Sequence, residues 1–225
     1  MVETGLSGRD VVVFGATGAL GAGLASTFAD LGAVVRGADL HMPAADRQLA
    51  GVRYESVDAL DDAALRDFFD ASPAPWAVLN TVGGYAPRRS LAELDRAELT
   101  RQLELNLVAA SLITKHALRV MMAAGEGRIV HTGSRAATVT AGNGFAYSVS
   151  KLGVLHLVEM AADEVRGTGV TVNCVVPSII DTPENRKALP SADHDAWPKV
   201  RDIAISFVFL ASPDAHLVNG AAVPV

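Results

Sequence analysis

The chain has 225 residues, half of them hydrophobic and a fifth charged, with a formal net charge of −6 at pH 7. This balance is typical of a globular protein of one domain (residues 1–225), and the acidic charge with scattered lysines and arginines argues against a nucleic-acid partner. No basic-then-apolar leader and no apolar stretch of roughly 20 residues is visible, so we expect no membrane contact and a cytoplasmic location.

Short β-branched segments alternate along the chain with longer segments of helical periodicity, which predicts an α/β fold with a doubly wound parallel sheet and helices on both faces. The expected elements are, in order, strand Asp10–Phe14, helix Ala19–Leu31, strand Ala33–Ala38, strand Val52–Ser56, helix Asp61–Asp70, strand Trp76–Thr81, helix Arg96–Ala124, strand Gly127–Thr132, helix Phe145–Gly167, strand Gly169–Val176, helix Lys199–Ala211 and strand Ala221–Val225.

Two features of the last third bear on function. Residues Pro177–Pro198 show no clear period and follow a strand at its carboxyl end, where ligands bind in open α/β sheets, so we expect a functional loop there. The single cysteine, Cys174, excludes an internal disulfide and lies in the apolar run Val170–Val176. We interpret it as a buried structural thiol.

A glycine-rich turn connects the first strand to the first helix. Gly15, Gly18 and Gly21 stand at the spacing G-x-x-G-x-x-G, which fits a dinucleotide-binding turn in this context. Glycine allows close backbone approach, and the helix N-terminus then faces the pyrophosphate. The expected cofactor contacts in this turn are Gly15, Thr17, Gly18, Ala19, Leu20 and Gly21.

An acidic residue, Asp39, ends the second predicted strand, where a carboxylate can accept hydrogen bonds from the adenosine ribose hydroxyls. A carboxylate there repels a 2′-phosphate, so NAD is favoured, with NADP as the alternative. Arg36 is the residue that favours NADP, and we expect it to point elsewhere. Asp58 follows the third strand and either meets the adenine amino group or caps the helix that begins near Asp61.

A tyrosine and a lysine, Tyr147 and Lys151, stand four residues apart and therefore share one helix face. A phenol with a pKa of about 10 is a poor proton donor or acceptor at neutral pH, and an adjacent ammonium stabilises the phenolate. Ser134 lies thirteen residues upstream of Tyr147 and is a candidate hydrogen-bond donor to the substrate oxygen. These three residues are the candidate catalytic group.

Together these motifs resemble the short-chain dehydrogenase/reductase family over nearly the whole chain. The family's Tyr-x-x-x-Lys and upstream serine match Tyr147, Lys151 and Ser134, and its helix asparagine matches Asn106. Its Asn-Asn-Ala-Gly strand end matches Asn80–Gly83 loosely. Its Pro-Gly segment and the following threonine match Pro177 and Thr182, with Ser178 in place of the glycine. The glycine spacing differs from that of the main branch and is similar to that of divergent branches.

The resemblance implies a single-domain Rossmann fold of about seven strands in the order 3-2-1-4-5-6-7. It implies that Tyr147 is the general acid/base, that Lys151 lowers the pKa of Tyr147 and binds the nicotinamide ribose, and that Ser134 stabilises the developing oxyanion. Asn106 would hold a relay water. The further cofactor contacts that it implies are Asn80, Gly83, Pro177, Ile180 and Thr182.

A narrower resemblance connects the loop after the sixth strand, and Tyr85 after Gly83-Gly84, to dihydropteridine reductases. Tyr85 and Trp197 are candidate substrate contacts on a planar ring. Such reductases carry a small apolar residue where Ser134 stands here, so Ser134 favours a small carbonyl or alcohol substrate. The alternatives are reduction of a quinonoid ring and a non-catalytic dinucleotide sensor or scaffold.

The family's usual assembly pairs its two longest helices across a two-fold axis, here Arg96–Ala124 and Phe145–Gly167. We expect a homodimer or homotetramer, because both helices carry apolar residues beyond one core-facing stripe. These include Leu103, Leu107, Val154 and Leu157. His41 and His194 have no partners at metal-ligand spacing, so we expect no metal site.

Overall fold

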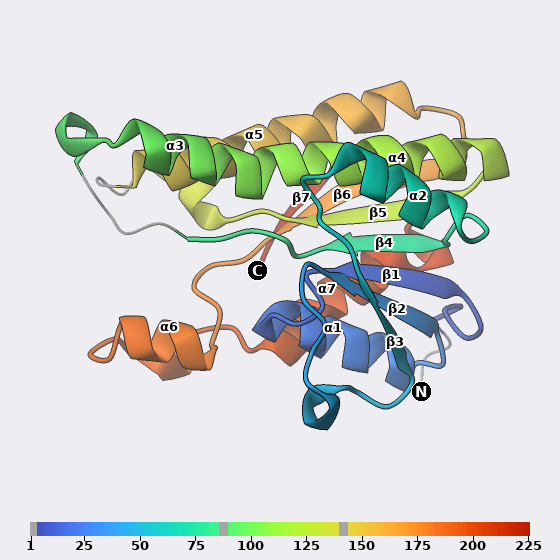
Figure 1. The fold of residues 1–225 in the computed structure, drawn as a ribbon, viewed down its shortest axis with the longest axis horizontal. Helices are drawn as coiled ribbons and strands as arrows, with labels where there is room; N and C mark the ends of the chain where they lie inside the picture. The colour runs from blue at the N-terminus through green and yellow to red at the C-terminus, as the bar shows by residue number, and fades with distance from the viewer. Residues whose placement is uncertain (1–3, 86–89, 140–143) are drawn as a thin grey trace.

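A computed structural model describes residues 4–85, 90–139 and 144–225. Its strands form one parallel sheet of seven strands in the order β3-β2-β1-β4-β5-β6-β7 (Figure 1). The strands are β1 (Asp10–Phe14), β2 (Val34–Asp39), β3 (Val52–Ser56), β4 (Ala77–Asn80), β5 (Gly127–Thr132), β6 (Val170–Val176) and β7 (Ala222–Pro224). The predicted doubly wound fold and its strand order are confirmed.

Helices cover both faces of the sheet. Figure 1 shows α1 and α7 below it and α2, α4 and α5 above it. The helices are α1 (Ala19–Asp30), α2 (Asp62–Asp70), α3 (Arg96–Gln102), α4 (Ala109–Ala124), α5 (Phe145–Glu164), α6 (Pro183–Ala188) and α7 (Val200–Ala211).

Each face of the sheet has its own hydrophobic core because side chains alternate along a strand. In β1, Val12 and Phe14 pack toward α2, α4 and α5, whereas Val11 and Val13 pack toward α1 and α7. All four side chains are fully buried. This two-sided burial explains why the strands are continuously apolar in the sequence.

The structure adds a local feature to one expected element and corrects another. The helix expected over Arg96–Ala124 is continuous but contains a π-helical segment, Leu103–Val108, between α3 and α4. The stretch Pro177–Pro198 is not an irregular loop, because it contains α6. Thr182 caps α6 and Pro183 occupies its first turn, a pairing that favours a helix start. The other boundaries agree to within a few residues.

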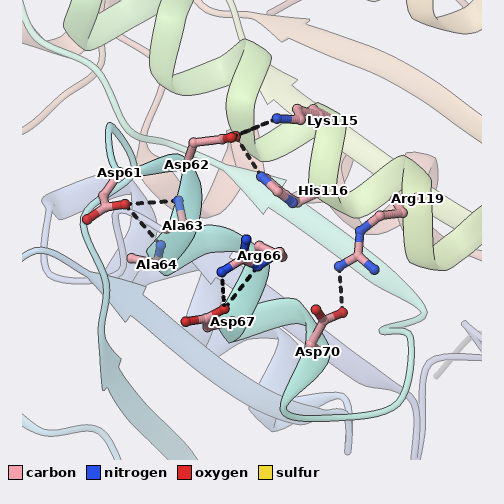
Figure 2. Close-up of polar contacts among 10 residues, drawn as sticks. All are labelled: Asp61, Asp62, Ala63, Ala64, Arg66, Asp67, Asp70, Lys115, His116 and Arg119. Atoms are coloured by element: carbon pink, nitrogen blue, oxygen red, sulfur yellow. Dashed lines mark hydrogen bonds and ion pairs between the residues drawn. The ribbon is translucent and has the colours of Figure 1, made fainter.

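The helix α2 is held against α4 by ion pairs as well as by its apolar face (Figure 2). The Asp62 carboxylate accepts hydrogen bonds from Lys115 Nζ at 2.7 Å and from His116 Nε2 at 2.8 Å. At the other end of α2, Arg119 of α4 donates to Asp70 at 2.6 Å. These contacts fix the helix that follows the third strand.

One helix among the described residues, Arg96–Ala124, is long and apolar enough to cross a membrane by length and composition alone. Its apolar residues belong to the hydrophobic core, since Ile113, Ala117 and Met121 are fully buried against the sheet. The helix therefore supplies core surface.

Candidate active site

The glycine turn brings the end of β1 and the start of α1 into very close contact. Gly15 has φ +79°, and a Cβ added to it would lie 2.6 Å from Thr81 Oγ1. A Cβ on Gly21 would lie 2.1 Å from the carbonyl oxygen of Gly15. Neither position can accept a side chain, whereas Gly18, the N-cap of α1, meets only ordinary contacts. The tight turn exposes the first N–H groups of α1, which have no intrahelical partners, at the carboxyl edge of the sheet.

Asp39 at the end of β2 is tied to this turn. Its carboxylate accepts hydrogen bonds from Thr17 N at 3.0 Å, Thr17 Oγ1 at 2.7 Å and Leu40 N at 2.8 Å. Arg36 points elsewhere, as expected, because its guanidinium pairs with Asp10 at 3.0 Å. The negative group therefore stands beside the glycine turn without a cationic partner among the described ion pairs.

Asp58 does not cap the helix after the third strand. The cap is Asp61, whose carboxylate accepts hydrogen bonds from Ala63 N and Ala64 N. Asp58 is exposed and accepts one hydrogen bond from Leu60 N at 2.9 Å. The capping alternative is therefore wrong for Asp58, and its role toward adenine stays a prediction.

The structure brings Tyr147, Lys151 and Ser134 to one place. Tyr147 and Lys151 lie in the first two turns of α5, and Ser134 follows β5. Burial raises the pKa of Tyr147, and a hydrogen bond with Ser134 acts in the opposite direction. Burial also lowers the pKa of Lys151 to about 8. The Lys151 ammonium donates to the carbonyl oxygen of Thr132 at 2.9 Å. The expected lowering of the Tyr147 pKa is not found in this arrangement, because burial of the phenol dominates and raises that pKa.

Asn106 and Lys151 meet at Gly83. A Cβ on Gly83 would lie 2.6 Å from Asn106 Oδ1 and 3.1 Å from Lys151 Nζ, so a side chain there would displace both. The Asn106 amide donates to Gly84 O at 3.1 Å and to Gln102 Oε1 at 3.0 Å, and its oxygen accepts from Gly84 N at 3.1 Å. Asn106 therefore connects the π-helical segment to the turn after β4.

Asn80 has a supporting position. It is buried, its amide oxygen accepts from Val82 N at 3.0 Å, and its amide nitrogen lies 3.1 Å from His131 Nδ1. The side chain is thus occupied by protein partners and shapes the turn toward Gly83. The contact expected between Asn80 and a cofactor stays a prediction.

The segment after β6 completes the edge of the sheet. The Pro177 carbonyl accepts from Arg135 N at 3.0 Å, next to Ser134. Thr182 is buried, and its hydroxyl accepts from Asn185 N at 3.2 Å as the cap of α6. Ile180 is partly buried, and its carbonyl accepts from Asn185 Nδ2 at 2.8 Å.

Of the two candidate substrate contacts, only Tyr85 lies beside the catalytic group. Its ring centroid is 5.1 Å from that of Tyr147 in an edge-on arrangement, and its side chain is exposed. Trp197 packs instead on His194, with ring centroids 4.6 Å apart. Among the described residues, no group of three or more His, Cys, Asp or Glu side chains is placed to hold a metal ion.

Sequence reasoning missed the partners that position these residues. The Thr132 carbonyl that holds Lys151 is a backbone group and leaves no sequence signal. Gln102 lies four residues before Asn106, the spacing of helix neighbours, and this signal was available. His131 lies in the segment that also contains Ser134, but its partners come from distant elements.

Comparisons with known proteins identify the family. A sequence family model described as Enoyl-(Acyl carrier protein) reductase matches residues 15–225. D-threitol dehydrogenase of Mycolicibacterium smegmatis is 32% identical, covering 96% of this chain and 90% of that protein. Cis-4-hydroxycyclohexanecarboxylate dehydrogenase of Sinomonas cyclohexanicum is 33% identical, covering 95% and 93%.

Among solved structures, a short-chain type dehydrogenase/reductase from Mycobacterium ulcerans superposes with a TM-score of 0.89 at 26% identity, covering 98% of this chain and 89% of that one. The fold, the strand order and the sequence matches agree with one another. The chain belongs to the short-chain dehydrogenase/reductase family of oxidoreductases.

Proposed function

We propose that this protein transfers a hydride between NAD(H) and a small carbonyl or alcohol substrate, with Tyr147 as the general acid/base. The observation that carries the proposal is the meeting of Tyr147, Ser134 and Lys151 at the sheet edge that also holds the glycine turn. Members of this family bind NAD(P) generally. The residues fit such a cofactor, because Gly15 and Gly21 let the backbone turn tightly into α1, whose first N–H groups have no intrahelical partners.

The bound dinucleotide would supply or accept the hydride, and this chain's residues would handle the proton. In reduction, Tyr147 donates its phenolic proton to the substrate oxygen, and in oxidation it removes that proton. Ser134 donates a hydrogen bond to the same oxygen where negative charge develops. The Lys151 ammonium would bind the ribose next to the nicotinamide. The Gly15 turn and the first N–H groups of α1 would hold the pyrophosphate.

The proposed preference for NAD rests on Asp39. Its carboxylate lies next to the glycine turn, and Arg36, the cation nearest to it in sequence, is engaged with Asp10. A 2′-phosphate would bring a second negative charge to this exposed position, and like charges about 4 Å apart repel one another by about 1 kcal/mol in water.

The proposed substrate is an alcohol or the corresponding carbonyl compound. Ser134 supports it, since an oxyanion partner is useful for an alkoxide and unnecessary for a quinonoid ring. The names of the two relatives above, dehydrogenases of D-threitol and of cis-4-hydroxycyclohexanecarboxylate, support a hydroxyl substrate. The retention of Tyr147, Lys151 and Ser134 argues against a non-catalytic sensor. We also propose a cytoplasmic enzyme of one domain that acts on free small molecules.

A substrate panel followed by NADH and NADPH absorbance tests the proposal, with Tyr147→Phe as the key variant. This change removes only the phenolic oxygen, so we expect kcat to fall by about 10²–10⁴-fold while NADH affinity stays near the wild-type value. Turnover of Tyr147→Phe at the wild-type rate would contradict the mechanism. A quinonoid dihydropterin belongs in the panel, because its reduction in preference to ordinary ketones would favour the alternative substrate class.

A further inference from the structure

The imidazole of His131 lies beneath the candidate active site with both of its nitrogens engaged. The residue is on β5 and is fully buried. Its Nδ1 is 3.1 Å from Asn80 Nδ2 at the end of β4, and its Nε2 is 2.9 Å from Thr114 Oγ1 on α4. One ring thus connects two neighbouring strands and the helix that covers them.

The neighbouring hydrogen bonds determine which nitrogen of His131 carries the proton. The Asn80 amide oxygen accepts from Val82 N, so the amide NH₂ faces the ring and Nδ1 must accept. The Thr114 hydroxyl donates its proton to the carbonyl of Ala110 at 2.7 Å, so its oxygen accepts from the ring. Every group in this chain of contacts is satisfied by the neutral form of His131 protonated on Nε2.

The same contacts lead directly to Lys151. Thr132 follows His131, its hydroxyl donates to the Asn80 carbonyl at 2.9 Å, and its own carbonyl accepts from Lys151 Nζ at 2.9 Å. On the β4 side, the Asn80–Val82 contact shapes the turn that brings Gly83 against the ammonium.

We propose that His131 is a positioning residue: in its neutral form protonated on Nε2, it joins the carboxyl ends of β4 and β5 to α4 and so fixes the Thr132 carbonyl and the Gly83 backbone against Lys151. The inference rests on the proposed function only where it concerns turnover. The placement of the Thr132 carbonyl against Lys151 can be tested without substrate or cofactor.

The surroundings favour a neutral ring. Lys151 of α5 is the charged group that acts on His131, and Cys174 of β6 is its register partner on the neighbouring strand. From α4 and β4 the ring is hydrogen-bonded to the uncharged side chains of Thr114 and Asn80. Burial and the nearby ammonium lower the pKa of His131 to about 3, so the ring stays uncharged at neutral pH.

The test follows the titration of Lys151 in the complete chain without cofactor, by NMR of protein labelled with ¹³C at lysine Cε. The chain's lysines are Lys115, Lys151, Lys187 and Lys199, and the Lys151 signal is identified by its loss in Lys151→Arg. In His131→Phe we expect the Lys151 midpoint to fall by roughly one pH unit, because a well-placed carbonyl acceptor favours the ammonium form. A role limited to stability would lower the melting temperature without moving this midpoint.

Two variants of Thr114 give a matched comparison that leaves His131 in place. Thr114→Val keeps the shape but removes the acceptor of Nε2–H, so we expect a smaller shift of the Lys151 midpoint in the same direction. Thr114→Ser keeps the hydroxyl and should titrate like the wild type. This pair carries the test if His131→Phe does not fold, as judged by thermal unfolding.

A Lys151 midpoint that is unchanged in the folded variants His131→Phe and Thr114→Val would overturn the inference. Titration and kinetics separate this failure from that of the proposed function. Absence of NAD(P)-dependent turnover in the wild type would reject the proposed function, whereas the shift of the Lys151 midpoint would still decide the role of His131.

Discussion

In the proposed mechanism, the carboxylate of Asp39 determines the preference for NADH over NADPH. We expect the wild type to bind NADH more tightly than NADPH. In Asp39→Ala the ratio of the two dissociation constants should narrow by about tenfold or reverse, because the like-charge repulsion is gone. Fluorescence titration of both cofactors measures the ratio.

Asp58→Ala is the control for this prediction. Asp58 is exposed at the end of the neighbouring strand, and a contact with adenine would affect both cofactors equally. The ratio should therefore stay as in the wild type. A native preference for NADPH would contradict the role given to Asp39.

Lys151 should destabilise the folded protein at neutral pH. Its pKa is lowered to about 8 by burial, so below that pH the folded state holds the proton at a cost that the unfolded state does not have. The cost is at most about 3 kcal/mol, and it disappears as the pH rises from about 8 to the ordinary lysine range. Lys151→Met should thus have a higher free energy of unfolding than the wild type at pH 7. The loss of the hydrogen bond to the Thr132 carbonyl reduces this gain.

Urea unfolding at pH 7 and near pH 10 measures this effect. We expect the advantage of Lys151→Met in the free energy of unfolding to shrink toward the higher pH. An advantage that is the same at both values would show that the buried ammonium is not its source.

Among the elements, α2 offers a clear test of an ion-pair contact (Figure 2). The hydrogen bonds from Lys115, and then from His116, lower the pKa of Asp62. A carboxylate with a lowered folded pKa stabilises the folded state above its unfolded pKa, and this contribution is lost as the pH falls through the folded value. Asp62→Ala should lower the melting temperature at pH 7, and the difference from the wild type should shrink as the pH falls through the lowered pKa of Asp62.

Asp67→Ala is the matched control on the same helix. Asp67 pairs with Arg66 on the exposed side of α2, where ion pairs contribute little. Thermal unfolding of both variants across the pH range gives the comparison. Equal losses in the two variants at pH 7 would contradict the proposed anchoring of α2 to α4.

Some of the helices and strands could be predicted from the sequence and others could not. Strands such as β1 were predictable because apolar β-branched runs have few alternative structures. The π-helical segment around Asn106 was not, because an inserted residue in a helix has no compositional signature and depends on the contact with Gly84. The start of α6 was predictable from Thr182-Pro183, but its short length hides any periodicity.

The same distinction holds within the candidate site. Tyr147, Lys151 and Ser134 have fixed spacings that indicate their chemistry, and the structure brings them together. The position of Tyr85 beside Tyr147 depends on how the turn after β4 meets α5, which sequence distance cannot show. The Lys151 acceptor is a backbone carbonyl and is invisible to any residue pattern.

For the whole molecule we expect a homodimer or homotetramer that pairs α4 and α5 across a two-fold axis. Val154 is buried within the chain, which corrects the expectation that it lies on an outer face. The exposed large apolar residues of the two helices are Met122, Phe145, Leu152 and Met160. Light scattering should show an assembly in the wild type and a monomer in Leu152→Glu/Met160→Glu, because charges would be buried at the interface.

Leu91→Glu changes an exposed leucine outside these helices and should leave the assembly intact. A wild type that is monomeric at all concentrations would reject the assembly. A wild-type assembly that survives the double substitution would place the interface on another face.

The rate at which the buried thiol of Cys174 is alkylated can report local opening of the fold. The thiol is fully buried, and burial raises its pKa to about 12. Alkylating reagents react with exposed thiolates, so they can reach it only during excursions in which β6 separates from its cover. A Cβ on Gly133 would lie 2.8 Å from its sulfur, so the thiol packs against the residue that precedes Ser134. The labelling rate of this one atom therefore reports how often the floor of the candidate active site opens, with no dye or engineered residue added.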